Sequence, residues 1–175
     1  LLLAQQKSIP VWDELELSSR LLRPGQRSRL AAVTGTNGKT TVVNLIGAIL
    51  DRAGLENRVC GNVGSPLIDT IKIDRGSGCA VDDDIIRVVE VSSFQLERTH
   101  TFRPFTAVLL NITSDHMDRH GDIEEYARTK MKLFDCQGSG DHAVINMDDR
   151  TASSLAPGIR IRRQGPRLIR YGLGR

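Results

Sequence analysis

A glycine-rich stretch in the first third of the chain has the residue types of a phosphate-binding loop. It runs from Gly35 to Thr41 and reads G-T-N-G-K-T-T. Glycines let backbone N–H groups approach an anion closely, a lysine can reach the β- and γ-phosphates, and a threonine hydroxyl can bind Mg²⁺. The spacing is shorter than in the common G-x-x-x-x-G-K-S/T loop, because Val33 stands where the first glycine of that loop would be. The alternative is a glycine turn whose threonine caps a helix.

A single carboxylate interrupts a later run of valines. Glu90 lies within the stretch V-V-E-V-S-S-F-Q-L. An unpaired carboxylate is costly to bury, so we expect a cation beside it. A Mg²⁺ ion bound to the nucleotide would supply that charge, and ligands of open α/β sheets gather where strands end. The alternative is a glutamate at a strand end that reaches solvent.

Several side chains able to bind divalent metals follow the next apolar segment, in N-I-T-S-D-H-M-D-R-H-G. They are Asp115, His116, Asp118 and His120. Carboxylates and imidazoles are common metal ligands, but the helical H-E-x-x-H pattern of many zinc enzymes is missing. The alternative is a capping aspartate with surface histidines.

One lysine is expected on the apolar face of a helix. Helical spacing places Lys130 on the face formed by Ile123, Tyr126, Ala127, Leu133 and Phe134, whereas Lys132 falls elsewhere. Its amine could reach solvent along its own aliphatic stem, which is the ordinary outcome. It could also be deprotonated by burial and react, or meet an anion. Spacing alone does not decide between these outcomes.

Short apolar segments alternate with helical patterns along the chain. We expect strands at 29–34, 84–91, 106–112 and 142–146, helices at 41–53 and 123–135, and shorter strands at 158–164 and 167–172. Near-continuous apolar strands are typical of parallel sheets that are covered on both faces. The predicted fold class is therefore α/β, with a mostly parallel sheet and flanking helices. The glycine-rich loop joins a strand to a helix, which is the context that phosphate binding requires.

Composition excludes several classes of protein. A net charge of +3 and seven aromatic residues in 175 argue against nucleic-acid binding. No apolar segment has the length of a membrane span, and the opening L-L-L-A-Q-Q lacks the features of a signal peptide. Cys60, Cys79 and Cys136 form no C-x-x-C pair, as expected for reduced thiols in a cytoplasmic protein. The chain has no initiator methionine, and we expect a fragment or a processed form.

Taken together, the motifs resemble the central ATP-binding domain of the Mur ligases, which form amide bonds in peptidoglycan synthesis. The resemblance rests on G-T-N-G-K-T-T, G-N-V-G-S-P-L, E-V-S-S-F-Q-L, N-I-T-S-D-H-M-D-R-H-G and Y-x-x-x-K. G-N-V-G-S-P-L and S-S-F-Q-L-E most resemble the members that add D-glutamate to UDP-N-acetylmuramoyl-L-alanine. The resemblance implies a P-loop-type domain over 28–175 that is incomplete at its C-terminal end. Residues 1–27 would be the remnant of an N-terminal domain and linker, and this chain alone would be inactive.

The resemblance also implies a mechanism. ATP would phosphorylate the substrate carboxylate, and the amine of D-glutamate would attack the resulting acyl phosphate. The nucleotide would be bound by Gly35, Thr36, Asn37, Gly38, Lys39, Thr40 and Thr41. One Mg²⁺ would be held by Thr40 and Glu90, and a second by His116, supported by Asp115, and by Lys130 after its carbamylation by CO₂. The catalytic residues would be Lys39, His116 and Lys130, with Asn62 and Ser92 at the substrate.

Other functions stay open at this stage. Another Mur ligase or a folylpolyglutamate-type ligase would share the G-T-x-G-K-T loop. A plain P-loop nucleotidase or kinase would hydrolyse ATP without a UDP-sugar, and would give no reason for the position of Lys130. A nucleotide-binding fragment without activity is the third alternative. We expect a monomer that binds neither nucleic acid nor membrane.

Overall fold

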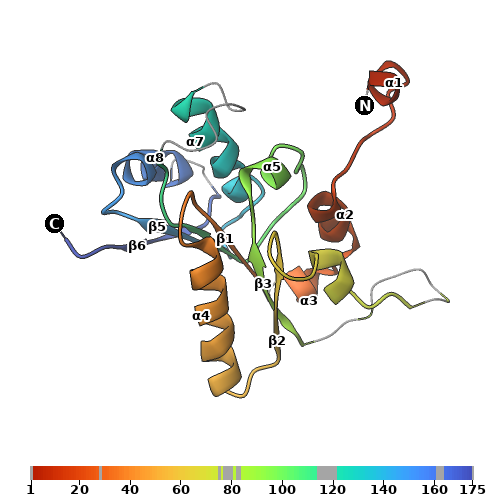
Figure 1. The fold of residues 1–175 in the computed structure, drawn as a ribbon, viewed down its shortest axis with the longest axis horizontal. Helices are drawn as coiled ribbons and strands as arrows, with labels where there is room; N and C mark the ends of the chain where they lie inside the picture. Colours follow the sequence, from red (N-terminus) through yellow and green to blue (C-terminus); the bar gives the residue numbers. More distant parts are fainter. Residues whose placement is uncertain are drawn as a thin grey trace.

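The computed structural model describes residues 2–27, 29–74, 76, 81, 84–113, 122–160 and 164–174. Its centre is a six-stranded sheet in which every neighbouring pair of strands is parallel (Figure 1). In spatial order the strands are β2 (Asn57–Gly61), β3 (Ile86–Glu90), β1 (Leu30–Thr34), β4 (Thr106–Leu109), β5 (His142–Asn146) and β6 (Arg167–Tyr171). The predicted α/β class with a mostly parallel sheet is confirmed.

Helices cover the two faces of this sheet. The helices of the described residues are α1 (Leu2–Gln6), α2 (Glu14–Leu21), α3 (Pro24–Arg27), α4 (Lys39–Arg52), α5 (Ser93–Leu96), α7 (Ile123–Met131) and α8 (Arg150–Arg160), with 3-10 turns η1 (Leu67–Thr70) and η2 (Lys132–Phe134), and not all of them touch the sheet. α4 packs on one face, while α2, η1, α5, α7 and α8 pack on the other. α1 stands apart from the body of the molecule at the N-terminal end (Figure 1). No helix among the described residues is long and apolar enough to span a bilayer.

Successive residues of each strand enter opposite cores, as the two-residue period of a strand requires. In β1, Ala32 contributes to the core under α7 and α8, and Val33 to the core under α4. In β3, Val89 and Val88 divide in the same way. The central strands are therefore buried on both faces, and only the ends of the strands remain for polar groups.

Most of the predicted elements are present with boundaries close to those expected. The predicted strand at 158–164 is wrong over 158–160, because residues up to Arg160 belong to α8, and 161–163 lie outside the described residues. The alternating G-I-R-I-R-R pattern favoured a strand, but Ala152, Ala156 and Ile159 form a buried helical face. Alanines at this spacing give only a weak apolar signal, which is why the helix was missed.

The order of the strands indicates where on the sheet a ligand should bind. β1 lies at the centre, with β3 on one side and β4 on the other. The chain thus leaves β1 at the point where the order of connections reverses, and ligands of open parallel sheets bind at such points beside the carboxyl ends of strands. The glycine-rich loop begins here.

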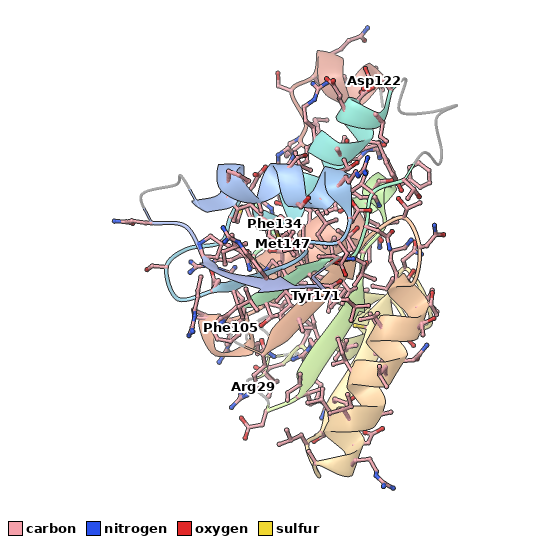
Figure 2. The ribbon with its side chains drawn as sticks, turned by 90° about the vertical axis from the view of Figure 1, so that its left-hand side faces the viewer. Arg29, Phe105, Asp122, Phe134, Met147 and Tyr171 are labelled. Atoms are coloured by element: carbon pink, nitrogen blue, oxygen red, sulfur yellow. The ribbon has the colours of Figure 1, made fainter. Side chains whose placement is uncertain are left out.

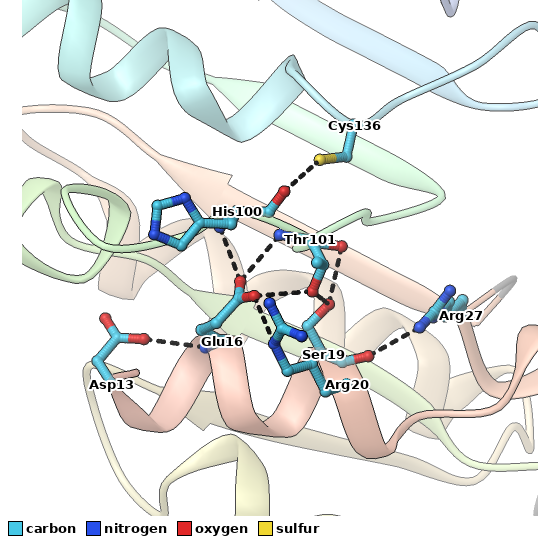
Figure 3. Close-up of polar contacts among 8 residues, drawn as sticks. All are labelled: Asp13, Glu16, Ser19, Arg20, Arg27, His100, Thr101 and Cys136. Atoms are coloured by element: carbon cyan, nitrogen blue, oxygen red, sulfur yellow. Dashed lines mark hydrogen bonds and ion pairs between the residues drawn. The ribbon is translucent and has the colours of Figure 1, made fainter. Parts of the chain in front are cut away.

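A buried glutamate ties the N-terminal helix α2 to this sheet domain. Glu16 is fully buried, and its carboxylate accepts hydrogen bonds from the N–H groups of His100 at 2.7 Å and Thr101 at 2.9 Å (Figure 3). It also accepts from the Thr101 hydroxyl at 3.0 Å and from Nε of Arg20 at 2.8 Å. Burial alone would raise the pKa of Glu16, but the bonds from His100, Thr101 and Arg20 lower it below the ordinary 4.5.

Replacing Glu16 with glutamine should destabilise the fold. The amide has one acceptor oxygen and presents an N–H group to donors, so at least one buried N–H loses its partner, at a cost of about 2 kcal/mol. Glu56→Gln is the control, because the Glu56–Arg58 pair is exposed and 3.7 Å long. Denaturant unfolding at neutral pH measures both variants.

The difference in stability between wild type and Glu16→Gln should depend on pH. Because the pKa of Glu16 is lowered in the folded state, its contribution is present above the ordinary value of 4.5 and is lost as the pH falls below it. The stability difference between wild type and Glu16→Gln should therefore shrink under acid conditions. A difference that is equally large at pH 7 and in strong acid would show that the carboxylate charge is not the cause.

Candidate active site

The loop after β1 has the shape expected of an anion-binding turn. Gly38 adopts a left-handed conformation, with φ of 81°, and stands at the N-cap of α4 without a side-chain cap. The first N–H groups of an α-helix have no partner within the helix, so those of α4 remain available to an anion. A Cβ atom at Gly35 would lie 3.0 Å from Cβ of Leu110, so glycine permits the loop to rest against the end of β4.

Lys39 is folded back over its own loop. Its Nζ donates to the carbonyl oxygens of Thr36 at 2.8 Å and Gly35 at 3.0 Å. The ammonium thus stands within the loop, where it can exchange these carbonyls for phosphate oxygens. The predicted strand–loop–helix context of Lys39 is confirmed.

A buried carboxylate joins three elements beside the loop. Glu90, 2% exposed at the end of β3, accepts from the Thr40 hydroxyl at 2.8 Å and from the Asn62 side-chain amide at 2.9 Å. The backbone N–H of Asn62 also donates to the Glu90 carbonyl at 2.9 Å. This close approach depends on Gly61, which has φ of 103° and where a Cβ atom would lie 2.3 Å from that carbonyl oxygen. The alternative in which Glu90 reaches solvent is thereby excluded.

The donors around Glu90 fit a hard cation. Within the described residues the carboxylate forms no ion pair, and its bonds come from two neutral groups, a hydroxyl and an amide. A buried carboxylate next to a threonine hydroxyl offers the oxygen ligands that Mg²⁺ prefers. The described ranges hold no cluster of three histidine, cysteine or acidic side chains suited to a metal. Asp115, His116, Asp118 and His120 lie outside those ranges.

Lys130 reaches the same loop from the far side of the sheet. It is 1% exposed, and its Nζ donates to the Gly35 carbonyl at 2.9 Å and lies 4.4 Å from the centre of the Tyr126 ring. Its predicted place on the inner face of the helix is confirmed, and the solvent-reaching alternative is wrong. Asp122 is the N-cap of α7, and its carboxylate accepts from Glu125 N at 2.7 Å. This end of α7 lies away from the sheet (Figure 2). Lys39 and Lys130 therefore share one carbonyl oxygen.

Comparison with known proteins identifies the family. Residues 33–175 match the Mur ligase middle domain. The chain belongs to the Mur ligase family. It is 52% identical over 159 residues to the UDP-N-acetylmuramoylalanine–D-glutamate ligase of Pelotomaculum thermopropionicum, covering 91% of this chain and 32% of that protein. The enzyme of the same name from Natranaerobius thermophilus is 47% identical, with coverage of 87% and 32%. The chain thus spans about a third of the length of these relatives.

Solved structures of Mur ligases share the fold. A UDP-N-acetylmuramoyl-L-alanyl-D-glutamate–2,6-diaminopimelate ligase superposes with a TM-score of 0.63 at 26% identity, covering 98% of this chain and 34% of that one. Escherichia coli FolC in complex with DHPP and ADP superposes with a TM-score of 0.56 at 17% identity, covering 91% and 46%. The second likeness shows the fold alone.

Ser92, expected at the substrate in this Mur ligase domain, serves as a helix cap. Its hydroxyl accepts from Gln95 N at 3.3 Å and donates to Gln95 Oε1 at 2.9 Å, and its own N–H donates to the same oxygen at 3.0 Å. These bonds form a capping box at the start of α5. The S-x-x-Q spacing carried that signal, which the sequence analysis overlooked.

Asn111 is a site residue that the sequence analysis missed. It follows β4 in the Mur ligase domain, and its side-chain amide bonds the loop at Thr36 and Asn37. A polar residue near the end of the apolar strand predicted at 106–112 was the available signal. Its partners could not be identified without knowing that β4 lies next to β1.

Proposed function

We propose that this chain is the ATP-binding part of a ligase that adds D-glutamate to UDP-N-acetylmuramoyl-L-alanine in peptidoglycan precursor synthesis. The names of the relatives at 52% and 47% identity support this substrate pair. The contact of Lys130 with the Gly35 carbonyl carries the proposal, because a plain nucleotidase gives no reason for a buried lysine at the loop. The proposed reaction passes through an acyl phosphate.

In this proposal the loop from Gly35 to Thr41 binds the phosphates of ATP. The ammonium of Lys39 exchanges the carbonyls of Gly35 and Thr36 for oxygens of the β- and γ-phosphates. The N–H groups at the start of α4 add donors, and the helix dipole favours the negative charge. Charge neutralisation is the main contribution that phosphoryl transfer asks of a protein.

The proposed Mg²⁺ ligands are Thr40 and Glu90 for one ion, and His116 with carbamylated Lys130 for a second. Mg²⁺ would neutralise charge on the phosphates as the γ-phosphoryl group is transferred. The buried position of Glu90 and its bond to Thr40 support the first pair. The buried amine of Lys130 supports the second, since only a neutral amine reacts with CO₂.

Asn62 is the proposed contact to the muramoyl substrate. Its side-chain amide donates to Glu90, so it stands between the proposed metal ligand and the loop that follows β2. Ser92 is proposed for the same substrate through its position two residues beyond the end of β3, although its hydroxyl caps α5. We further propose that residues 28–175 form the nucleotide-binding domain of a cytoplasmic monomer.

Phosphate release in the protein of full natural length tests the function. We expect release only when ATP, UDP-N-acetylmuramoyl-L-alanine and D-glutamate are all present, with one phosphate formed per amide. Replacing D-glutamate with meso-diaminopimelate or lysine should stop the reaction. Phosphate release with ATP alone, at the same rate, would identify a nucleotidase instead.

A further inference from the structure

The side chain of Asn111 reaches across from the end of β4 to the loop that follows β1. Its Oδ1 accepts from the backbone N–H groups of Thr36 at 3.0 Å and Asn37 at 2.9 Å. Its Nδ2 donates to the Asn37 carbonyl at 3.0 Å. One amide thus satisfies three backbone groups of a loop that is 74 residues away in the sequence.

Backbone contacts hold the same half of the loop against β4. Thr36 N donates to the Asn111 carbonyl at 3.0 Å as well, and its hydroxyl accepts from Thr113 N at 3.0 Å. Gly35 lies so close to Leu110 that a Cβ atom there would stand 3.0 Å from Leu110 Cβ. The first half of the loop therefore faces the neighbouring strand.

The second half of the loop has a different orientation. Val42 N donates to the Gly38 carbonyl at 3.0 Å, which closes the first turn of α4. The N–H groups of residues 39–41 precede that bond and have no partner within the helix. Gly38 supplies no side-chain cap to them.

We propose that Asn111 is a positioning residue that divides this short loop into two parts with different tasks. It holds the N–H groups of Thr36 and Asn37 inside the protein, and it leaves those of residues 39–41 for phosphate. The common loop has two more residues between its glycines. In this shorter loop, the Asn111 side chain holds the backbone of Thr36 and Asn37 in place of the two missing loop residues. The nucleotide part of this inference rests on the proposed function.

Amide hydrogen exchange and ADP binding test the division in the protein of full natural length. In Asn111→Ala, the Asn37 amide should exchange faster, because Oδ1 is its acceptor, whereas Thr36 keeps the residue-111 carbonyl. ADP affinity should fall by about fivefold or more, the effect of one lost hydrogen bond at the loop. In wild type, adding ADP should slow exchange at residues 39–41 and leave the Asn37 amide unchanged.

Two further variants separate positioning from folding. Asn44→Ala is the matched control, since the exposed Asn44 amide bonds the Thr40 carbonyl at 2.9 Å but none of the loop N–H groups, and it should keep wild-type values. Asn111→Asp keeps an acceptor, so the Asn37 amide should stay protected, while the added negative charge weakens ADP binding.

Unchanged protection of the Asn37 amide in Asn111→Ala would overturn the proposal. ADP-induced protection at Asn37 in wild type would overturn it too, because that N–H would then face phosphate. A wild-type protein that binds no ADP would refute the proposed function. The exchange of the Asn37 amide is measured without nucleotide and would still decide the role of Asn111.

Discussion

Replacing Lys130 with alanine in the protein of full natural length should remove most of the proposed ligase activity while leaving nucleotide binding nearly intact. Lys130 is buried and donates to the Gly35 carbonyl of the loop, and that carbonyl keeps Lys39 as a donor in the variant. Loss of the proposed carbamate ligand would remove stabilisation of the transferred phosphoryl group, and we expect acyl-phosphate formation to fall by about a hundredfold or more. Calorimetry measures ADP binding, and phosphate release measures the reaction.

Chemical rescue distinguishes a carbamate from a structural lysine. Short carboxylic acids should restore part of the rate in Lys130→Ala, since a carboxylate can occupy the space and supply the missing oxygen ligand. Lys132→Ala is the control on the adjoining turn, because its Nζ donates to the Glu97 carbonyl at 2.7 Å, away from the loop. Full activity of Lys130→Ala without any additive would refute the proposed role.

Lys39→Ala should weaken ATP binding by about 1.5–3 kcal/mol, or roughly 10- to 150-fold in affinity. The charged Nζ already lies within the loop, at 2.8 Å from the Thr36 carbonyl, so little movement is needed to reach a phosphate. Titration calorimetry with the protein of full natural length gives the affinity directly.

The control for this loss is Lys72→Ala, which removes the same charge from an exposed position. It should bind ATP as wild type does, because a distant exposed charge is screened by salt. Equal affinities for wild type and Lys39→Ala would show that the phosphates bind elsewhere.

The sequence predicted the parts of the fold that rest on strong apolar periodicity. β3 and β4 are nearly continuous apolar runs, and the inner face of α7 was clear enough to place Lys130. β2 was not predicted, because N-R-V-C-G has few apolar residues and lies at the edge of the sheet. Local pattern carries little signal in such a strand.

Contacts between distant segments were beyond local reasoning. The bonds from Asn111 to Asn37 depend on β4 lying next to β1. No single segment of the sequence specifies that order of strands. The Thr40–Glu90 bond was within reach, because both residues were expected at carboxyl ends of the sheet. The position of His116 stays a prediction, since it lies outside the described residues.

Helix α2 also bonds the segment that follows Asn62. The carboxylate of Glu14 accepts from the backbone N–H of Ile68 at 2.7 Å, and Ile68 lies within η1. Glu16 accepts from His100 and Thr101 on the other side. One short helix therefore provides acceptors for two separate connections of the sheet.

These contacts of α2 determine how far the N-terminus of a recombinant chain can be truncated. A shortened chain starting at residue 28 would keep the whole family match from residue 33, yet it would leave the N–H groups of Ile68, His100 and Thr101 without these acceptors. It would also open the core beneath Leu15, which is fully buried. For recombinant work, the smallest stable unit should begin before Asp13, so that both carboxylates and the cap of α2 are retained.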